Sequence, residues 1–207
     1  MMWRGVEESS ERYRVVYAST DRAGAFGETI ARYRPDLALL QELKDIDDDE
    51  PLEPWLEGGV VPADYRLQRR LGETILDPSL RFVDVFDARA VQALRPALSP
   101  IARRLGLPDV DLSTVMGPNR ELTKQLSLYL HEQRDEQGHP RYAGIRYVSR
   151  MNANWELWAV FDDRLMHAAV VPEDIYADDP GLVEAARLLG VNIEVVNGHL
   201  LFTLTPR

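Results

Sequence analysis

The sequence of 207 residues contains no cysteine. Disulfide bonds, thiolate-bound metal sites and a cysteine nucleophile are therefore excluded. No apolar run approaches the roughly 20 residues that a membrane-spanning helix needs. The stretch from Met1 to Arg14 is polar and charged, unlike a signal peptide. We therefore expect a cytoplasmic protein with no membrane contact.

Common catalytic motifs are also missing. The sequence has no Walker loop, no Gly-x-Gly-x-x-Gly, no His-Glu-x-x-His and no Gly-x-Ser-x-Gly. Its four histidines occur singly, at His131, His139, His167 and His199. A solitary histidine is more often structural than metal-binding, because metal ligands usually recur at close spacing. We expect no bound metal.

The net charge is negative, and most of the excess acidic residues lie in one segment. Asp and Glu number 34 against 24 Lys and Arg, a net charge of −10, and seven of the acids lie between residues 45 and 57, where there is no base. The rest of the chain carries only −3, without the basic surface that nucleic acid requires, so we expect no nucleic-acid partner. A few arginines in a cleft could still bind a small anion. The acidic block is read first as a solvated loop, and second as a surface for a basic partner or a mimic of nucleic acid.

Strands and helices alternate without a strict βαβ rhythm, which predicts an α+β fold. The predicted strands are 14–18, 81–86, 142–149 and 155–161. Residues 65–76 show mixed signals and are predicted to be extended in part. The predicted helices are 22–34, 37–43, 88–105 with interruptions at Pro96 and Pro100, 120–134 and 180–189. A hairpin is predicted at Asn197-Gly198, between residues 191–196 and 199–204. A helix-turn-helix around 182–191 is the weaker alternative for that region, because its flanks are acidic.

One unusual stretch runs from Tyr17 to Thr29, across the end of a predicted strand and into a helix. Glu28 lies two positions after Phe26, about 200° around the helix, and so points off its apolar face. The plainer interpretation, and the one that spacing favours, is a solvated carboxylate that pairs with Arg32.

A second unusual stretch is Ala143-Gly144-Ile145-Arg146-Tyr147-Val148-Ser149-Arg150. Strand periodicity puts Ile145, Tyr147 and Ser149 on one face and Arg146 on the other. A hydroxyl between two arginines could bind a phosphate. An ordinary strand with its polar edge in water is the plainer interpretation.

Together the two stretches resemble the RES domain, a family named for an arginine, a glutamate and a serine. The resemblance rests on Tyr-Ala-x-x-x-x-x-x-x-Phe-x-Glu after a strand and Gly-Ile-Arg-Tyr-x-Ser-Arg far downstream. It extends over Phe82-Val83-Asp84-Val85, Gly117-Pro118-Asn119-Arg120-Glu121-Leu122-Thr123 and Trp158-Ala159-Val160-Phe161, and so covers roughly Arg4 to Phe161.

The resemblance implies an ADP-ribosyltransferase-like fold with NAD+ in a central cleft. Members include NAD+-degrading toxins of toxin–antitoxin pairs, so the implied partner is an Xre-type antitoxin. The RES-like domain would span residues 1–165, with 166–207 as an extension packed on the same domain. A homo-oligomer is also compatible with the sequence.

Carried onto this chain, the family glutamate is Glu28 and the family serine is Ser149. Arg4 matches the N-terminal arginine, and Tyr17 matches an aromatic before the helix. Arg146 and Arg150 are further substrate-binding candidates. The family usually has a second N-terminal arginine, for which Arg12 or Arg14 could substitute. A catalytically inactive RES-like binding or regulatory module is therefore the alternative.

The expected reaction is cleavage of the nicotinamide–ribose bond of NAD+. Neutral nicotinamide leaves, so a strong general acid is unnecessary, whereas the oxocarbenium-like ribose needs a carboxylate. Arginine would hold the pyrophosphate and Tyr17 would stack on the nicotinamide. Ser149 would orient the ribose or a phosphate rather than act as a nucleophile, since no base is evident beside it. The acceptor stays open among water, phosphate and a protein side chain.

Overall fold

We describe the protein from a computed structural model. The structure describes residues 13–36, 38, 41, 59–165 and 171–195. The chain divides into two compact units. The first unit comprises Met1–Ala25 and Thr74–Val170, and the second comprises Phe26–Glu73 and Val171–Arg207. Both units are therefore built from two separate stretches of sequence.

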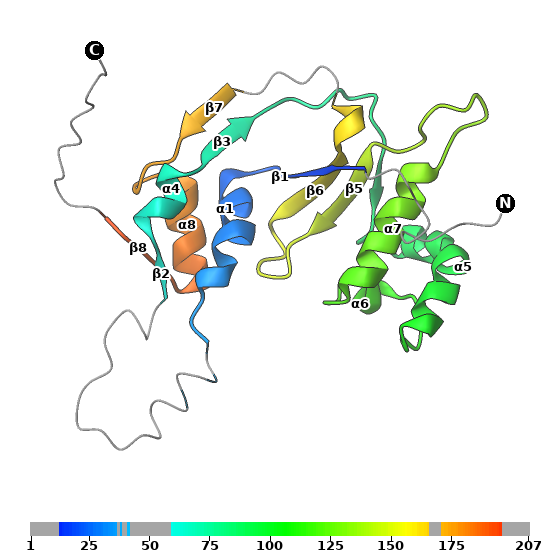
Figure 1. The fold of residues 1–207 in the computed structure, drawn as a ribbon, viewed down its shortest axis with the longest axis horizontal. Helices are drawn as coiled ribbons and strands as arrows, with labels where there is room; N and C mark the ends of the chain where they lie inside the picture. Colours follow the sequence, from blue (N-terminus) through cyan, green and yellow to red (C-terminus); the bar gives the residue numbers. More distant parts are fainter. Residues whose placement is uncertain (1–12, 37, 39–40, 42–58, 166–170, 196–207) are drawn as a thin grey trace, which may run out of the picture. The chain divides into compact units, whose positions relative to one another are not determined.

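The first unit contains a four-stranded sheet in the order β1-β6-β5-β4 (Figure 1). Its strands are β1 (Val15–Ser19), β4 (Phe82–Asp84), β5 (Gly144–Val148) and β6 (Glu156–Phe161). Strand β6 runs antiparallel to β1 and β5, whereas β4 and β5 are parallel. Its other elements are α5 (Ala88–Arg104), α6 (Leu112–Val115), α7 (Arg120–Glu132) and the 3-10 helix η3 (Asp162–Arg164).

The pairing of the strands defines two faces of this sheet. One row across it is Ala18, Trp158, Arg146 and Asp84. The next row is Tyr17, Ala159, Ile145 and Val83. Because neighbouring residues of a strand point to opposite faces, these rows belong to opposite faces, which we call the Arg146 face and the Tyr17 face. The alternation predicted for residues 142–149 is confirmed.

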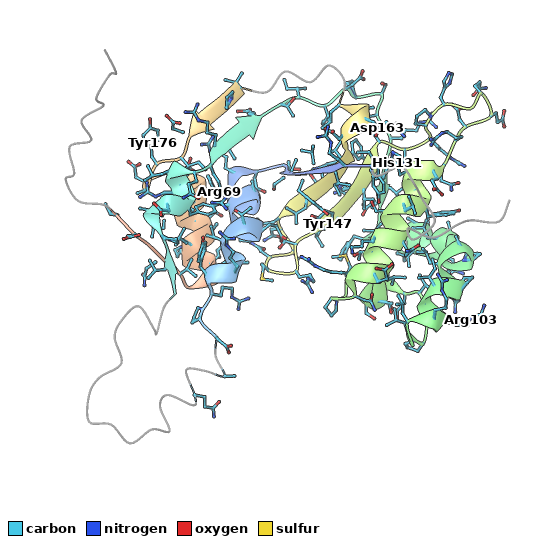
Figure 2. The ribbon with its side chains drawn as sticks, viewed as in Figure 1. Arg69, Arg103, His131, Tyr147, Asp163 and Tyr176 are labelled. Atoms are coloured by element: carbon cyan, nitrogen blue, oxygen red, sulfur yellow. The ribbon has the colours of Figure 1, made fainter. Side chains whose placement is uncertain are left out.

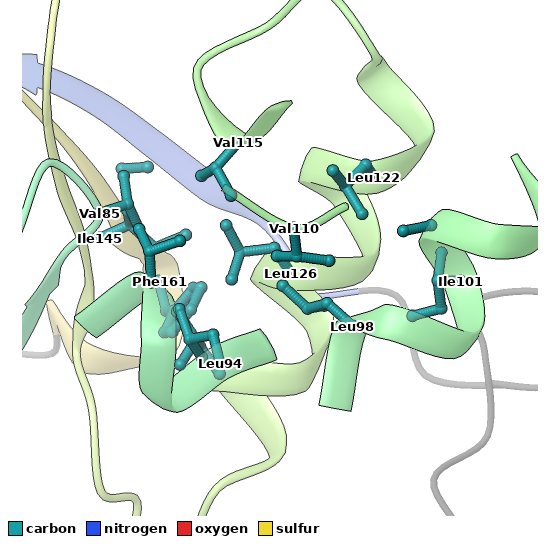
Figure 3. Packing of buried hydrophobic residues seen from close by; sticks show 14 residues of the cluster. Val85, Leu94, Leu98, Ile101, Val110, Val115, Leu122, Leu126, Ile145 and Phe161 are labelled. Atoms are coloured by element: carbon teal, nitrogen blue, oxygen red, sulfur yellow. The ribbon is translucent and has the colours of Figure 1, made fainter. Parts of the chain in front are cut away.

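Helices α5 and α7 supply most of the hydrophobic core on the Tyr17 face (Figure 3). Ile145, Ala159 and Phe161 from the sheet pack against Leu98 and Leu126 from the helices. The amphipathic pattern predicted for residues 120–134 is confirmed, since Leu122, Leu126 and Leu130 are all buried.

Helix α5 corrects one expectation. It runs unbroken from Ala88 to Arg104 with Pro96 and Pro100 inside it, although each proline removes a backbone hydrogen bond. Burial of Leu94 and Leu98 on the same helix outweighs this loss. Packing between elements therefore overrides the local preference that predicted an interruption.

The second unit is built around short elements. Helix α1 (Arg22–Ile30) crosses the boundary at Phe26 and is followed by the 3-10 helix η2 (Ala31–Tyr33). The remaining elements are β2 (Val60–Val61), α4 (Ala63–Leu67), β3 (Arg70–Glu73), β7 (Val171–Asp174), α8 (Pro180–Leu189) and β8 (Asn192–Ile193). Strand β2 pairs in parallel with β8, and β3 pairs antiparallel with β7.

Helix α8 occupies the predicted residues 180–189. It ends at Gly190, whose φ of +67° is the left-handed conformation typical of a helix end. Strand β8 follows, instead of the second helix of a helix-turn-helix. The predicted hairpin turn lies outside the described residues. Residues 65–76, predicted to be extended in part, contain the end of helix α4 and the strand β3.

The described residues form a mixed α+β structure, as predicted. The expected division at residue 165 differs from the observed units, because residues 26–73 group with 171–207. Within the described part of the chain, no helix is long and apolar enough to cross a membrane. The acidic block and most of the predicted helix 37–43 lie outside the described residues.

Candidate functional site

Tyr17 lies in the middle of the edge strand β1, where its backbone pairs with Ala159 of β6. Its side chain points to the same face as the core but is 73% exposed. An aromatic ring this accessible in a strand contributes little to packing. It is therefore available to stack on a planar ligand.

Ser149 follows the last residue of β5 and is buried. Its Oγ accepts a hydrogen bond from the Met151 amide at 2.9 Å, and its own amide donates to the Trp155 carbonyl at 2.9 Å. The serine thus anchors the turn between β5 and β6. It lies on the Tyr17 face, because it continues the alternation of Ile145 and Tyr147.

Tyr17 and Ser149 share a face but are not adjacent. Strand β6 separates β1 from β5, and Ser149 lies four residues beyond the row that contains Tyr17. Strand spacing makes this about 10 Å across the sheet and about 13 Å along it. Tyr17 is 73% exposed and Ser149 only 4%, so the two side chains do not form one accessible site in this structure.

Glu28 lies in helix α1, in the part that belongs to the second unit, and is exposed. This agrees with its predicted position off the apolar face, whereas Phe26 and Ile30 are buried. Arg32 lies over the ring of Tyr33 with its guanidinium carbon 4.7 Å from the ring centroid.

The predicted arginines differ in their surroundings. Arg4 and Arg12 lie outside the described residues. Arg14 is an exposed side chain that forms an ion pair with Asp162 at 2.8 Å. Arg150 is exposed, just after Ser149. Arg146 is half-buried, and it points to the face opposite Tyr17 and Ser149.

Arg146 is held between two carboxylates from neighbouring strands. Its guanidinium forms ion pairs with Asp84 of β4 and Glu156 of β6. The hydrogen bond to Glu156 raises the pKa of Arg146 above its ordinary value, and the charge of Asp84 adds to this. Arg146 therefore remains a cation, but both of its partners already belong to the protein.

The network continues to the start of α1. Glu156 also accepts a hydrogen bond from the hydroxyl of Thr20, and the Trp158 indole Nε1 donates to the same hydroxyl at 2.9 Å. The bond from Thr20 is the main cause that lowers the pKa of Glu156, with Arg146 contributing further. Glu156 is therefore an anion at neutral pH.

An aromatic pair borders these polar groups. The rings of Phe82 and Trp158 meet edge to face with centroids 4.9 Å apart, and the guanidinium carbon of Arg146 lies 6.0 Å from the Trp158 ring centroid. The Arg146 face therefore presents a cation, two carboxylates and an indole within one sheet. Such a surface can donate and accept hydrogen bonds beside a flat apolar ring.

The sequence indicated Arg146 but missed Asp84, Glu156, Thr20 and Trp158 as its neighbours. Glu156 is the first residue of β6, a strand predicted to be almost wholly apolar. A single acidic residue in such a strand was the sequence feature that could have indicated a polar partner. Its pairing with Arg146 depends on the register between β5 and β6, which a single sequence does not reveal.

His131 lies among aromatic rings and an acidic side chain of the first unit. Its ring stacks on Tyr13 with centroids 4.5 Å apart, and its Nε2 lies 3.2 Å from Oδ2 of Asp163 (Figure 2). Among the residues that the structure describes, no group of three or more His, Cys, Asp or Glu could hold a metal ion.

Compared with known proteins, the chain matches no family model, no curated protein and no solved structure. Any function proposed for this chain therefore depends on its own residues and on the resemblance of its motifs.

Proposed function

We propose that the chain is an NAD+-consuming enzyme of the toxin type, which cleaves the bond between nicotinamide and ribose. The observation that carries this proposal is the shared face of Tyr17 and Ser149. These residues are 132 positions apart in the sequence, yet the register of β1, β6 and β5 points both to one side of the sheet. Tyr17 is the accessible residue of this pair, whereas Ser149 is buried.

In the proposed reaction, the bond from the ribose C1′ to the nicotinamide nitrogen breaks and its electron pair leaves with neutral nicotinamide. The ribose develops oxocarbenium character, which a carboxylate stabilises, and the resemblance assigns this role to Glu28. Water, phosphate or a protein side chain then bonds to C1′ and loses a proton. Tyr17 stacks on the nicotinamide ring, and Ser149 orients the ribose or a phosphate oxygen.

A cognate antitoxin of the Xre type is the proposed partner, which would hold the activity in check by blocking access to NAD+. The cell location consistent with this substrate is the cytoplasm. Both statements depend on the proposed reaction and share its test.

The purified chain should be incubated with NAD+, with and without phosphate, and the products identified by mass spectrometry. We expect free nicotinamide, together with ADP-ribose for hydrolysis or a phosphorylated ADP-ribose for phosphorolysis. Transfer to the protein would appear as an ADP-ribosyl mass increment on the chain. Unchanged NAD+ under all conditions would contradict the proposal.

Glu28→Gln removes the charge of the carboxylate while nearly preserving the size of the side chain. Loss of a transition-state charge contact is expected to lower turnover by at least about 100-fold. Glu184→Gln is the matched control, since Glu184 is also an exposed glutamate on a helix of the second unit. Equal turnover by wild type and Glu28→Gln would refute the role of Glu28.

The second candidate function is a non-catalytic binding or regulatory module. One observation favours it: Arg146, a candidate for holding the pyrophosphate, is neutralised by Asp84 and Glu156 and points away from the Tyr17 face. A module of this kind would bind NAD+ weakly or fail to bind it. Calorimetric titration with NAD+ alongside the turnover assay separates the two functions.

A further inference from the structure

A cavity of about 550 Å³ lies in the first unit, away from the residues discussed so far. Its wall includes the residues just before β4 and β5, the loop between α7 and β5, and the end of η3. Ser149 follows the opposite end of β5. The cavity is therefore separate from the surface proposed for NAD+.

The cavity wall is rich in arginine. Four arginines line it, namely Arg81, Arg134, Arg141 and Arg164, together with the carboxylates Asp135 and Glu136. The charge of this lining is therefore positive, although the whole chain is strongly acidic. Asp135 accepts hydrogen bonds from the backbone amides of Gln137 and His139 at 3.0 and 2.8 Å. Its charge is thus partly neutralised by its own loop.

Arg164 is the most informative of the four. Its side chain is only 12% exposed, and Nη1 forms an ion pair with Asp163, a carboxylate that also contacts His131. Nε and Nη2 are buried and have no hydrogen-bond partner in the part of the chain that the structure describes. Buried donors are almost always paired, so two unpaired donors on one guanidinium indicate a missing acceptor.

These two nitrogens form the edge of a guanidinium that binds oxyanions through two parallel hydrogen bonds. Arg95 shows this arrangement elsewhere in the same unit. Its Nε and Nη2 donate to the two carboxylate oxygens of Asp109 at 2.9 and 2.8 Å. Arg164 has the same edge, but within the described part of the chain no oxyanion accepts from these two nitrogens.

We propose that this cavity binds the phosphate group of a small anionic molecule. Binding turns the Nε–Nη2 edge of Arg164, which is covered in this structure, toward the cavity, where it donates to two phosphate oxygens. Arg81 and Arg141 add positive charge from the cavity wall. Arg134 is fixed nearby, because its Nη1 donates to the carbonyls of His131 and Gln133. Several arginines favour a multiply charged phosphate over a single carboxylate.

Isothermal titration calorimetry of the full chain tests the site, with inorganic phosphate and pyrophosphate as probes at constant ionic strength. We expect saturable binding of pyrophosphate at one site. Arg164→Gln should raise its Kd at least tenfold, and Arg81→Gln should raise it several-fold. Arg103→Gln is the control, since Arg103 is an exposed arginine on α5 outside the cavity (Figure 2), and should leave the Kd unchanged.

Absence of saturable binding of both probes would overturn the proposal, as would equal weakening by Arg103→Gln and Arg164→Gln. Binding of citrate without binding of either phosphate probe would show that the site takes carboxylates instead. Circular dichroism checks that Arg164→Gln folds. If it does not, the comparison of Arg81→Gln with Arg103→Gln decides. NAD+ turnover plays no part in these measurements, so this proposal and the proposed enzyme can fail separately.

Discussion

Tyr17 exposes 73% of its surface although it lies within a strand. If its ring stacks on nicotinamide, Tyr17→Ala should raise the KM for NAD+ by about threefold to tenfold, the effect of losing one aromatic contact. Tyr17→Phe keeps the ring and should stay within about twofold of wild type. Steady-state kinetics measure both variants.

Tyr176→Ala is a suitable control for this series, because Tyr176 is 65% exposed and lies outside the proposed site. Its KM should match wild type. Equal kinetics for Tyr17→Ala and wild type would remove Tyr17 from the proposed site.

Glu156 gives a prediction about pH. Its pKa lies below the ordinary value of 4.5 in the folded protein, mainly because it accepts a hydrogen bond from Thr20. The stabilisation is therefore complete above about pH 4.5 and is lost as the pH falls through the lower, folded pKa. At pH 7, Glu156→Gln should reduce the free energy of unfolding by about 1–2 kcal/mol.

The difference between wild type and Glu156→Gln should shrink in acid, because the wild-type carboxyl is then protonated as well. Urea denaturation followed by tryptophan fluorescence between pH 7 and pH 3 measures this. Glu136→Gln, at an exposed position of the same unit, should show no such convergence. A difference that is constant with pH would contradict the role given to Glu156.

Helix α8 is capped at both ends, by Asp179 at its start and by Gly190 at its end. The buried carboxylate of Asp179 accepts from the amides of Gly181 and Leu182, at 2.9 and 3.3 Å. Asp179→Ala should therefore destabilise the second unit by about 1–2 kcal/mol. Asp178→Ala removes the exposed neighbouring carboxylate and should cost less than about 0.5 kcal/mol.

Thermal unfolding monitored by the helical circular dichroism signal compares the two variants. Equal melting temperatures for Asp178→Ala and Asp179→Ala would show that the cap contributes nothing.

The long amphipathic helices and the strands of the four-stranded sheet could be predicted from the sequence, whereas most short elements of the second unit could not. Helices α7 and α8 and strand β5 carry several turns or alternations of buried residues, so their patterns are unambiguous. Strands β3 and β7 span four residues each and form only by pairing with each other across about a hundred positions. Helix α5 was predicted with breaks because the local effect of Pro96 and Pro100 was weighed without the core that holds them.

The candidate site shows the same division. The exposure of Glu28 and the faces of Arg146 and Ser149 follow from periodicity, and were predicted. The ion pair between Arg146 and Asp84 joins strands 62 positions apart, so it depends on a parallel pairing that local patterns do not specify.

For the molecule as a whole, the division into units predicts the effect of truncation. A chain ending at residue 165 lacks β7 and β8, the partners of β3 and β2, and loses the buried residues of α8. The second unit should then fail to fold, because the short strands β2 and β3 are not stable without their pairing partners. The first unit keeps its four-stranded sheet.

Hydrogen exchange with mass spectrometry tests this. Amides of β3 should exchange at the rate of an unfolded peptide in the truncated chain and remain protected in the full chain. Amides of β5 and β6 should stay protected in both. Equal protection of β3 in the two chains would contradict the assignment of these segments to one unit.

The interleaving of the two units also affects synthesis on the ribosome. Residues 26–73 leave the exit tunnel before most of the first unit, yet their partners in β7, α8 and β8 emerge last. The second unit can therefore fold only after its last segment has been synthesised. Until then, during translation of about a hundred further codons, the apolar residues Phe26, Ile30 and Val61 remain accessible to chaperones. Arrest-peptide force measurements at successive chain lengths should detect the folding of the sheet first and that of the α8 region second.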